Sequence, residues 1–312
     1  MKCKKLFAFS VLVLSFAFLT AGFATATAEK AETAGAAPIA ENLELATYRG
    51  VSIGGILSAR DPDGGPFRFE ITTKPTKGSI DLDGDGHFVY TPAEGKRGKD
   101  YFGYKAIDAD GNYSQEATVI IKIQKQNSKL SYTDTLGDAG AYAAVRLAEE
   151  GIFTGEQLAG QYVFHPERPV TREEFLTMCM KLSGKQPLLD VASTGFADDE
   201  AIETWAKPYV NAALRYGVVS GYGTDGGVVF APDRAVTVLE AALMLDHAIG
   251  LTDAVTTWFG YDGSVPAWAL QSASNVAACG LLPYGCSFSD SSLRRADAAE
   301  MLLAAMQILE KR

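Results

Sequence analysis

The second half of the chain repeats itself, and this restricts the fold more than any other sequence feature. The segment VFHPERPVTREEFLTMCMKL (163–182) lines up with VFAPDRAVTVLEAALMLDHA (229–248), and a shorter third copy reads CSFSDSSLRRADAAEMLLAAM (286–306). A tryptophan also precedes a glycine by 12 residues twice, at Trp205 and at Trp268. Three copies at a spacing of about 65 residues predict a repeat architecture, whose units bury their apolar faces against one another.

The repeated half shows the hydrophobic periodicity of amphipathic helices. AYAAVRLAEEGIF, WAKPYVNAALRYGVV and WALQSASNVAACGLL each carry apolar residues at i, i+3, i+4 and i+7. Each ends at a glycine followed by an apolar pair, which is typical of a helix C-cap. We therefore expect an all-α module of three repeats, at residues 131–183, 194–250 and 256–310.

Residues 38–125 show instead the alternating pattern of short β-strands. FRFEI and ATVIIKI alternate between apolar and polar residues, and turn signals such as Asp63-Gly64-Gly65 recur about every dozen residues. Six or seven short strands in about 90 residues predict an all-β sandwich. A short polar linker at 126–130 joins the two halves.

The N-terminus has the three parts of a secretory signal. Lys2, Lys4 and Lys5 come before an apolar run, and the run is followed by the small residues Ala26-Thr27-Ala28. We expect a signal peptide at 1–28 with cleavage after Ala28, a flexible leader at 29–37, and a secreted product with no membrane span. A retained membrane anchor is the alternative, but no basic stop-transfer patch follows the run.

Charge and cysteine content narrow the classes of function. Without the three signal lysines the chain has 25 basic and 38 acidic residues, a net charge of about −13, which disfavours nucleic-acid partners. Cys179 lies in an apolar helical run and is expected in the core. Cys279 and Cys286 flank GLLPYG and are interpreted either as a disulfide or as small buried hydrophobes, the second being favoured.

Catalytic signatures are missing from the sequence. The chain has only three histidines, at positions without metal-ligand spacing, and it contains neither a G-x-S-x-G elbow nor a phosphate loop. Acidic pairs such as Asp198-Asp199 are more simply helix caps than glycosidase carboxylates. We therefore expect a protein that is not an enzyme and that needs no cofactor.

The repeats resemble the S-layer homology family of bacterial cell-wall anchoring modules. The matching residues of repeat 2 are Phe196-Ala197-Asp198, Trp205-Ala206, GVVSGY, FAP and VTVLE; repeat 1 supplies YTD, GI, FHP and VTREE, and repeat 3 supplies WA, GL and LRRAD. The resemblance implies a pseudo-threefold bundle whose grooves, between repeats, bind an anionic secondary cell-wall polysaccharide that is often pyruvylated. There are departures, with Ala139 in place of the tryptophan of repeat 1 and Val238 in place of the arginine of repeat 2.

The chemistry of an anionic sugar agrees with this resemblance. A carboxylate pairs with an arginine fork, a sugar ring stacks on an indole, and hydroxyls donate to aspartate. If each groove joins the arginine of one repeat to the aspartate and tryptophan of the next, Arg172, Asp198 and Trp205 form a complete set. Trp205 begins an amphipathic helix, however, and taken alone it is more simply a core residue. The incomplete sets contain Asp262 with Trp268, and Arg295 with Asp134.

The N-terminal half resembles the cadherin-like and bacterial immunoglobulin-like repeats of surface proteins, through GGILSARDPDGGPFRFEITTKPTKGSI, DGHFVYTP and GKDYFGYKAIDADGNYSQEATVIIKI. The stretch DLDGDGHFVYTP begins like a calcium-binding EF-hand loop. Its twelfth residue is Pro92 instead of a bidentate carboxylate, so a β-hairpin turn is predicted. A weaker calcium hypothesis concerns four loop aspartates, Asp61, Asp63, Asp108 and Asp110.

Together these features predict a secreted surface protein with an immunoglobulin-like sandwich before a three-repeat S-layer homology module. Its expected function is non-covalent attachment to cell-wall polysaccharide at the cell surface. Two alternatives stay open: an adhesin whose sandwich binds a host or matrix partner, and a subunit that self-associates into a surface lattice.

Overall fold

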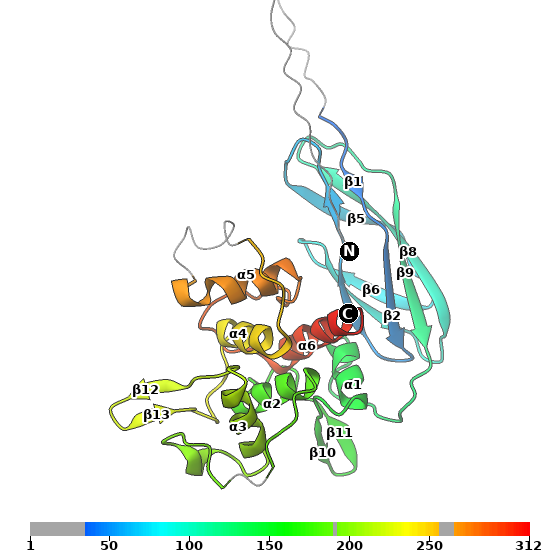
Figure 1. Cartoon of the computed structure of the whole chain (residues 1–312). Helices are drawn as coiled ribbons and strands as arrows, with labels where there is room; N and C mark the ends of the chain where they lie inside the picture. Colours follow the sequence, from blue (N-terminus) through cyan, green and yellow to red (C-terminus); the bar gives the residue numbers. More distant parts are fainter. Residues whose placement is uncertain (1–34, 190–191, 256–264) are drawn as a thin grey trace, which may run out of the picture. The chain divides into compact units, whose positions relative to one another are not determined.

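The computed structural model describes residues 35–189, 192–255 and 265–312, with strands over residues 39–124 and helices from residue 141 onward (Figure 1). The expected signal peptide and Asp262 lie outside the described residues. Among the described residues, no helix has the length and apolar character needed to cross a membrane.

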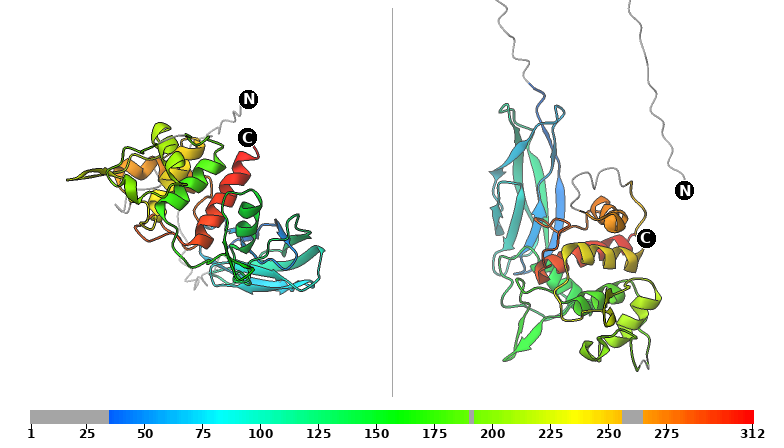
Figure 2. Two further views of the ribbon diagram at one scale, coloured as in Figure 1. Left: turned by 90° about the horizontal axis from the view of Figure 1, so that it is seen from below. Right: turned by 90° about the vertical axis from the view of Figure 1, so that its left-hand side faces the viewer.

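Two larger sheets and one two-stranded sheet form the N-terminal part (Figures 1 and 2). The four-stranded sheet has the order β2 (Leu43–Tyr48), β9 (Ala117–Gln124), β8 (Gly98–Asp108) and β5 (Phe67–Thr73). The three-stranded sheet has the order β3 (Ile53–Ile56), β7 (His87–Pro92) and β6 (Gly78–Leu82), and β1 (Ile39–Ala40) pairs with β4 (Ala59–Arg60). Strands β2 and β9 are parallel and the other pairs are antiparallel.

The expected alternation of buried and outward residues is confirmed in the central strand β9. Ala117, Val119, Ile121 and Ile123 are buried, and the residues between them are partly exposed. These side chains join the aromatic rings of β7 and β8 in one core, because strand residues of one parity share a face. The edge strand β5 is more exposed than its pattern predicted, with Phe67 at 36%.

The EF-hand-like stretch is a hairpin turn, as predicted. Strands β6 and β7 pair in antiparallel register, with Leu82 opposite Phe88. Within the turn, the Asp83 carboxylate accepts hydrogen bonds from the backbone amides of Asp85 and His87, both at 2.9 Å. The aspartate therefore stabilises the turn itself.

The C-terminal part contains six α-helices within the described residues: α1 (Ala141–Glu149), α2 (Arg172–Leu182), α3 (Lys207–Arg215), α4 (Val238–Ile249), α5 (Leu270–Ala278) and α6 (Arg295–Leu309). Two short 3-10 turns precede α3 and α5: η1 (Asp199–Ala201) and η3 (Ala267–Ala269). Cys179 is fully buried in α2, as expected, and Cys279 and Cys286 are free thiols.

Expected helix-end signals are confirmed at both ends. Gly151, Gly217 and Gly280 follow α1, α3 and α5 with φ values of 67°, 70° and 65°, a conformation that glycine adopts at low cost. At the N-termini of α2 and α4, Thr171 with Glu174 and Thr237 with Glu240 form complete capping boxes.

The all-α prediction is wrong in one respect, because two repeats contain a β-hairpin. Strands β10 (Glu156–Leu158) and β11 (Gln161–Val163) form one, and β12 (Tyr222–Thr224) and β13 (Gly227–Val229) form the other. Each hairpin turns through a glycine-containing pair, Ala159-Gly160 and Asp225-Gly226. The sequence did not predict these hairpins, because three-residue strands are too short to show periodicity.

A closed ring of backbone hydrogen bonds joins the segments that precede α2, α4 and α6. The amide of Val170 donates to the carbonyl of Leu293, Leu293 donates to Val236, and Val236 donates back to Val170, at 3.0, 2.9 and 2.9 Å. All three side chains are fully buried. The three helix N-termini are thus fixed relative to one another, and each faces the loop of another copy.

Candidate functional site

Two arginines at equivalent helix starts reach into the next copy of the repeat. Arg172 is the first residue of α2, and its Nε donates to the carbonyl of Phe230 at 3.0 Å. Arg295 is the first residue of α6, and its Nε donates to the carbonyl of Phe164 at 2.7 Å. Both arginines are buried, at 4% and 3% exposure, and burial lowers the pKa of each guanidinium.

The two predicted aspartates hold the same phenylalanines from the other side. Asp198 accepts hydrogen bonds from the amides of Phe230 and Ala231, at 2.8 and 2.7 Å. Asp134 accepts from the amides of Phe164 and His165, at 2.8 and 2.7 Å. The structure thus brings each predicted arginine–aspartate pair together at one loop, and gives the aspartates a role in holding that loop.

The residue after each phenylalanine has a left-handed backbone. His165 has φ 57° and Ala231 has φ 58°, a region that residues with a Cβ rarely adopt. Because Asp134 and Asp198 each bind the amide of that residue, they compensate for its conformational cost. The loops are therefore built in the same way in both repeats.

Beside Arg172 lie an aromatic ring, a carboxylate and a second arginine. The guanidinium lies 4.6 Å from the centre of the Tyr222 ring, and its Nη1 is 3.4 Å from the Glu240 carboxylate. Arg234 contacts the same carboxylate at 2.5 Å and also donates to the Tyr222 hydroxyl, which in turn donates to Glu240. We call Arg172, Tyr222, Arg234 and Glu240 the Arg172 site.

The surroundings keep the carboxylate of Glu240 charged and the phenol of Tyr222 neutral. Burial works to raise the pKa of Glu240, but hydrogen bonds from Tyr222 and Arg234 outweigh burial and hold that pKa below its usual value. Burial and the hydrogen bond to Glu240 raise the pKa of Tyr222 to about 12. Two guanidiniums therefore face one carboxylate and a neutral phenol.

Beside Arg295 the balance of charge is different. Its Nη2 donates to the carbonyl of Thr154 at 3.1 Å, and its Nη1 lies 3.7 Å from the Glu174 carboxylate. Arg168 forms ion pairs with Glu156 at 2.7 Å and with Glu174 at 3.0 Å. In this Arg295 site, made of Arg168, Glu156, Glu174 and Arg295, two guanidiniums therefore face two carboxylates.

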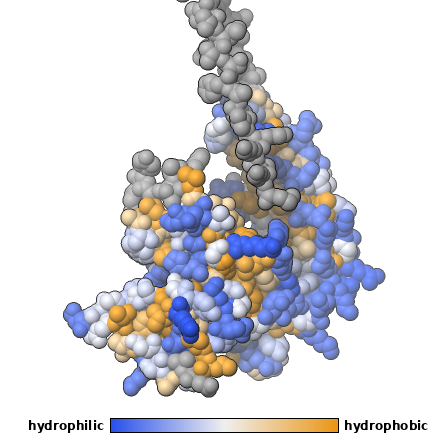
Figure 3. Space-filling view, viewed as in Figure 1, coloured by the Kyte–Doolittle hydropathy of each residue, from blue (hydrophilic) through white to orange (hydrophobic). Residues whose placement is uncertain are grey.

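The predicted tryptophans are solvent-exposed, so the interpretation of Trp205 as a core residue is wrong. Trp205 is 49% exposed and Trp268 is 70% exposed. The buried residue of the Trp-Ala pair is the alanine, since Ala206 and Ala269 are fully buried. Figure 3 shows apolar and hydrophilic residues side by side on the surface of the helical part.

Ala139 stands where the Arg295 site would have its tryptophan, and a strand of the sandwich occupies that place. The Ala139 carbonyl accepts a hydrogen bond from the amide of Gly54 in β3 at 3.1 Å. A Cβ on Gly54 would come within 2.7 Å of the Ala139 Cβ, so the contact leaves no room for a larger side chain. This explains one departure from the family pattern.

The third predicted set is incomplete in the structure. Val238, which replaces the arginine, is buried at 1% exposure in the first turn of α4. Trp268 is exposed, and Asp262 lies outside the described residues. The second copy therefore has no arginine at the position equivalent to Arg172 and Arg295.

Sequence reasoning missed the partners of the two arginines, although a signal for them was present. The second repeat follows the first with an offset of 66 residues, which places Arg234 at the position of Arg168 and Glu240 at that of Glu174. The same offset places Tyr222 at the position of Glu156. The shared arginine and glutamate, and the exchanged tyrosine, were visible in the alignment of the repeats.

Two of the four loop aspartates proposed for calcium bind amides of their own turns, and Asp63 accepts from the amide of Ala36. Asp61 accepts from the amides of Asp63 and Gly65, and Asp108 accepts from both nitrogens of Asn112. Residues 35–189, 192–255 and 265–312 contain no group of three or more histidine, cysteine or acidic side chains that could hold a metal ion. Calcium binding by these aspartates stays a prediction.

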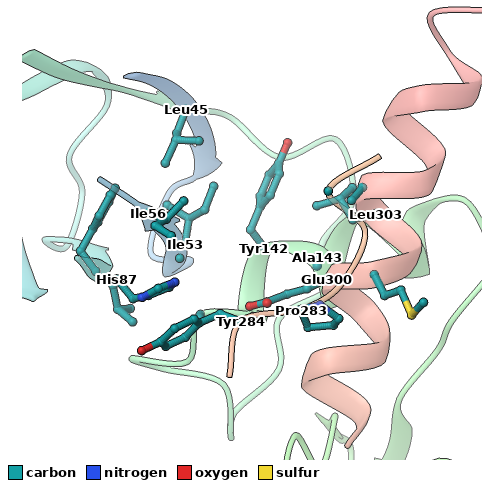
Figure 4. Close-up of a pocket in the computed structure, with 18 of the residues that line it drawn as sticks. Leu45, Ile53, Ile56, His87, Tyr142, Ala143, Pro283, Tyr284, Glu300 and Leu303 are labelled. Carbon is teal, nitrogen blue, oxygen red and sulfur yellow. The ribbon is translucent and has the colours of Figure 1, made fainter. Parts of the chain in front are cut away.

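A separate, mainly apolar cavity of about 890 Å³ lies between β3 and β7 on one side and α6 with the 280–285 loop on the other (Figure 4). Glu300 of α6 lines it, and burial, with Asp297 and Asp138 nearby, raises the pKa of this carboxyl to about 7. The arginines described above do not line this cavity.

Comparison with known proteins agrees with both halves of the chain. Residues 35–125 match the family model of the bacterial cadherin-like domain, and residues 195–242 match that of the S-layer homology domain. The chain is 27% identical over 161 residues to a surface-layer 125 kDa protein of Lysinibacillus sphaericus, covering 47% of this chain and 13% of that protein. It is 31% identical over 130 residues to exoglucanase XynX of Acetivibrio thermocellus, covering 40% of this chain and 11% of that protein.

The chain thus matches only a small share of the length of these curated relatives. Among solved structures, the sialic acid binding region of a Streptococcus sanguinis adhesin matches with 18% identity and a TM-score of 0.22, over 31% of each chain. A TM-score of this size carries no argument about function. The family matches and the surface-layer relative show that this chain combines a bacterial cadherin-like domain with an S-layer homology domain.

Proposed function

We propose that the chain is a non-enzymatic cell-surface protein that attaches to the cell wall by binding an anionic wall polysaccharide through its helical part. The helical part acts as a three-repeat S-layer homology module with pseudo-threefold packing. The ring through Val170, Val236 and Leu293 supports this arrangement, since one bond of the same kind joins each pair of copies. The sandwich is the part that attachment would display.

The observation that carries the proposal is the Arg172 site with its excess of positive charge. Two guanidiniums share one carboxylate, so the group has a net charge of about +1 in a chain with many more acidic than basic residues. A sugar carboxylate, such as that of a pyruvyl ketal, would complete the pairing through charge-assisted hydrogen bonds. Arg234 is the more accessible donor, because its side chain is 42% exposed whereas that of Arg172 is 5% exposed.

Trp205 supplies the second part of a sugar site. A half-exposed indole offers the flat apolar face on which a pyranose ring stacks. The chain connects it closely to the arginine, since the carboxylate of Glu173, next to Arg172, binds the amide of Glu203 at 3.2 Å. Asp198 contributes indirectly by fixing the loop that carries Phe230 and Ala231.

Sedimentation with isolated cell walls tests this function. We expect the full chain to pellet with walls of the source cell, and we expect the pelleting to disappear when acid extraction removes the wall polysaccharide. Purified polysaccharide should compete, and the variant Tyr222→Glu should pellet less. Equal pelleting on stripped walls would contradict the proposal and would indicate that the sandwich, or another wall component, provides the contact.

A further inference from the structure

Glu173 is a buried acidic residue in the first turn of α2, directly after Arg172. Its exposure is 4%, and its carboxylate accepts a hydrogen bond from the backbone amide of Glu203 at 3.2 Å. At the equivalent positions of the other two copies stand Leu239 and Ala296. A carboxylate at this place therefore belongs to the first copy alone and is not required by the repeat architecture.

The amide that Glu173 binds belongs to the turn that presents Trp205. In this turn the Glu203 carbonyl accepts from the amides of Ala206 and Lys207, at 2.9 and 3.1 Å, and so starts α3. The flanking Ile202 and Ala206 are buried, whereas Trp205 between them is half exposed. The orientation of the indole thus depends on how the turn at 203–206 is held.

The same helix turn is also tied to the loop after β13. The backbone amides of Arg172 and Glu173 donate to the carbonyls of Arg234 and Pro232, at 2.9 and 3.2 Å. One short segment therefore connects the arginine, the loop that carries Arg234 and the tryptophan turn. Of these three connections, only that to the tryptophan turn depends on the Glu173 side chain.

We propose that Glu173 is a positioning residue of the sugar site, which fixes the turn at 203–206 and thereby sets the place of Trp205 relative to Arg172. This inference rests on the proposed function for its ligand, an anionic polysaccharide, but its structural content does not need the ligand. Burial raises the pKa of Glu173 against the lowering effect of the hydrogen bond from the Glu203 amide, and the negative charges of Asp233, Glu203 and Glu174 also raise it. A protonated carboxyl still accepts through its carbonyl oxygen, so the connection survives titration.

Fluorescence of Trp205 tests the positioning directly. In the full chain with Trp258→Phe and Trp268→Phe, Trp205 is the only tryptophan left of three. We expect Glu173→Leu, which installs the residue of the second copy, to increase acrylamide quenching and lower the anisotropy of Trp205. Glu173→Gln should keep both values, because its amide oxygen still accepts from Glu203. The matched control Glu203→Ala should also keep them, since the bond uses the backbone of Glu203 alone.

Affinity for purified wall polysaccharide, measured by calorimetry, gives the second readout. We expect a loss of at least fivefold for Glu173→Leu and changes within twofold for Glu173→Gln and Glu203→Ala. If wild type does not bind the polysaccharide, the proposed function fails, and the fluorescence still decides the positioning role. Unchanged fluorescence in Glu173→Leu, or an equal effect of Glu173→Gln, would overturn that role.

A second variant removes the donor of the same hydrogen bond, and it tests the positioning role even if Glu173→Leu does not fold. Glu203→Pro deletes the donor amide, and the extended backbone of Ile202 (φ −76°, ψ 123°) is the conformation required before proline. We expect Glu203→Pro to reproduce the fluorescence change, and the double variant to add nothing further. Additive effects of the two substitutions would contradict a shared bond.

Discussion

The Arg172 and Arg295 sites are built on the same plan and differ in what surrounds the guanidinium. Each arginine begins a helix, binds a phenylalanine carbonyl of another copy and faces a loop held by an aspartate. The Arg172 site has Tyr222 and a nearby exposed tryptophan, whereas the Arg295 site has Glu156 and, at Ala139, a contact with the sandwich. One scaffold thus supports a positive site and a neutral site, and the two differ by one exchanged side chain, Tyr222 in place of Glu156.

The largest expected effect is the loss of stability when the buried arginine that both sites share is removed. Arg295→Ala leaves the carbonyls of Phe164 and Thr154 without this donor, and should cost about 3 kcal/mol of the free energy of unfolding. Arg172→Ala should cost about 2 kcal/mol, because Glu240 keeps Arg234 and Tyr222 as partners. Urea unfolding of the full chain measures both.

Arg68→Ala, at an exposed position of β5, is the control for the arginine deletions and should change stability little. If both buried arginines could be removed without loss of stability, the shared scaffold role would be refuted. Arg172 is not a free ligand-binding group, because its side chain is buried and donates a hydrogen bond within the protein.

Exchanging the side chain that differs should convert one site toward the other. Tyr222→Glu adds a carboxylate between Arg172 and Arg234, and should lower affinity for an anionic wall polysaccharide about tenfold. Calorimetry with purified polysaccharide provides the measurement. Tyr222→Phe is the control, because it keeps the ring beside the guanidiniums without adding a charge. An affinity unaffected by the glutamate would place the ligand elsewhere.

The reverse exchange should have a smaller effect. Glu156→Tyr removes one of two carboxylates from the Arg295 site and should raise its affinity for the polysaccharide about two- to threefold. The gain stays small because Ala139 supplies no indole and contacts β3. Calorimetry would show this gain most clearly as a change in binding stoichiometry from one site to two. A gain as large as the loss in Tyr222→Glu would mean that tryptophan contributes little.

Acid should weaken the loop of the second copy through Asp199, which has no acidic counterpart in the first copy. Hydrogen bonds from Lys207 and Thr194 lower the pKa of Asp199 to about 2, while position 135 of the first copy is a threonine. A depressed pKa stabilises the fold above the unfolded value near 4, and this contribution is lost as the pH falls toward 2. Solvent screening limits it to less than about 1 kcal/mol. Asp199→Asn should therefore match wild type at pH 2 and be less stable at pH 6 in urea unfolding.

The smallest expected effect concerns the left-handed residues. Ala231→Gly removes the steric cost of φ 58° and should raise the free energy of unfolding by about 0.5 kcal/mol. His165→Gly should gain less, since His165 Nε2 lies 3.8 Å from the Glu156 carboxylate. Thermal melting of both variants measures the difference. A loss in Ala231→Gly would show that chain entropy outweighs the strain.

Much of the helical part could be predicted because its signals are local. Glycine after each apolar helix face, and threonine three residues before glutamate, identify helix ends from sequence alone. The pairing of Arg172 with the Asp198 loop was also predictable once the repeats were aligned. The short hairpins were missed, because three-residue strands depend on the loop that they close and show no period of their own.

The exposure of Trp205 and the burial of Arg172 could not be predicted from sequence. Each depends on contacts between copies: Arg172 is covered by Phe230 and Tyr222 of the second copy, and Trp205 is directed outward by a turn that Glu173 of the first copy binds. An apolar helix face shows that some residues are buried, but not which of two neighbours faces the core. At the Trp205-Ala206 pair the smaller residue is buried and the larger one exposed.

The ring through Val170, Val236 and Leu293 has a consequence for how this part comes apart. In a linear array of repeats the terminal unit has one neighbour and can fray by itself. In the ring every unit has two neighbours, because the first copy binds the third as well as the second. Opening any one unit breaks two connections, so the three copies should unfold as one cooperative body. Such a ring should resist unravelling by a pulling force or a protease better than a linear array, because none of its three units is terminal.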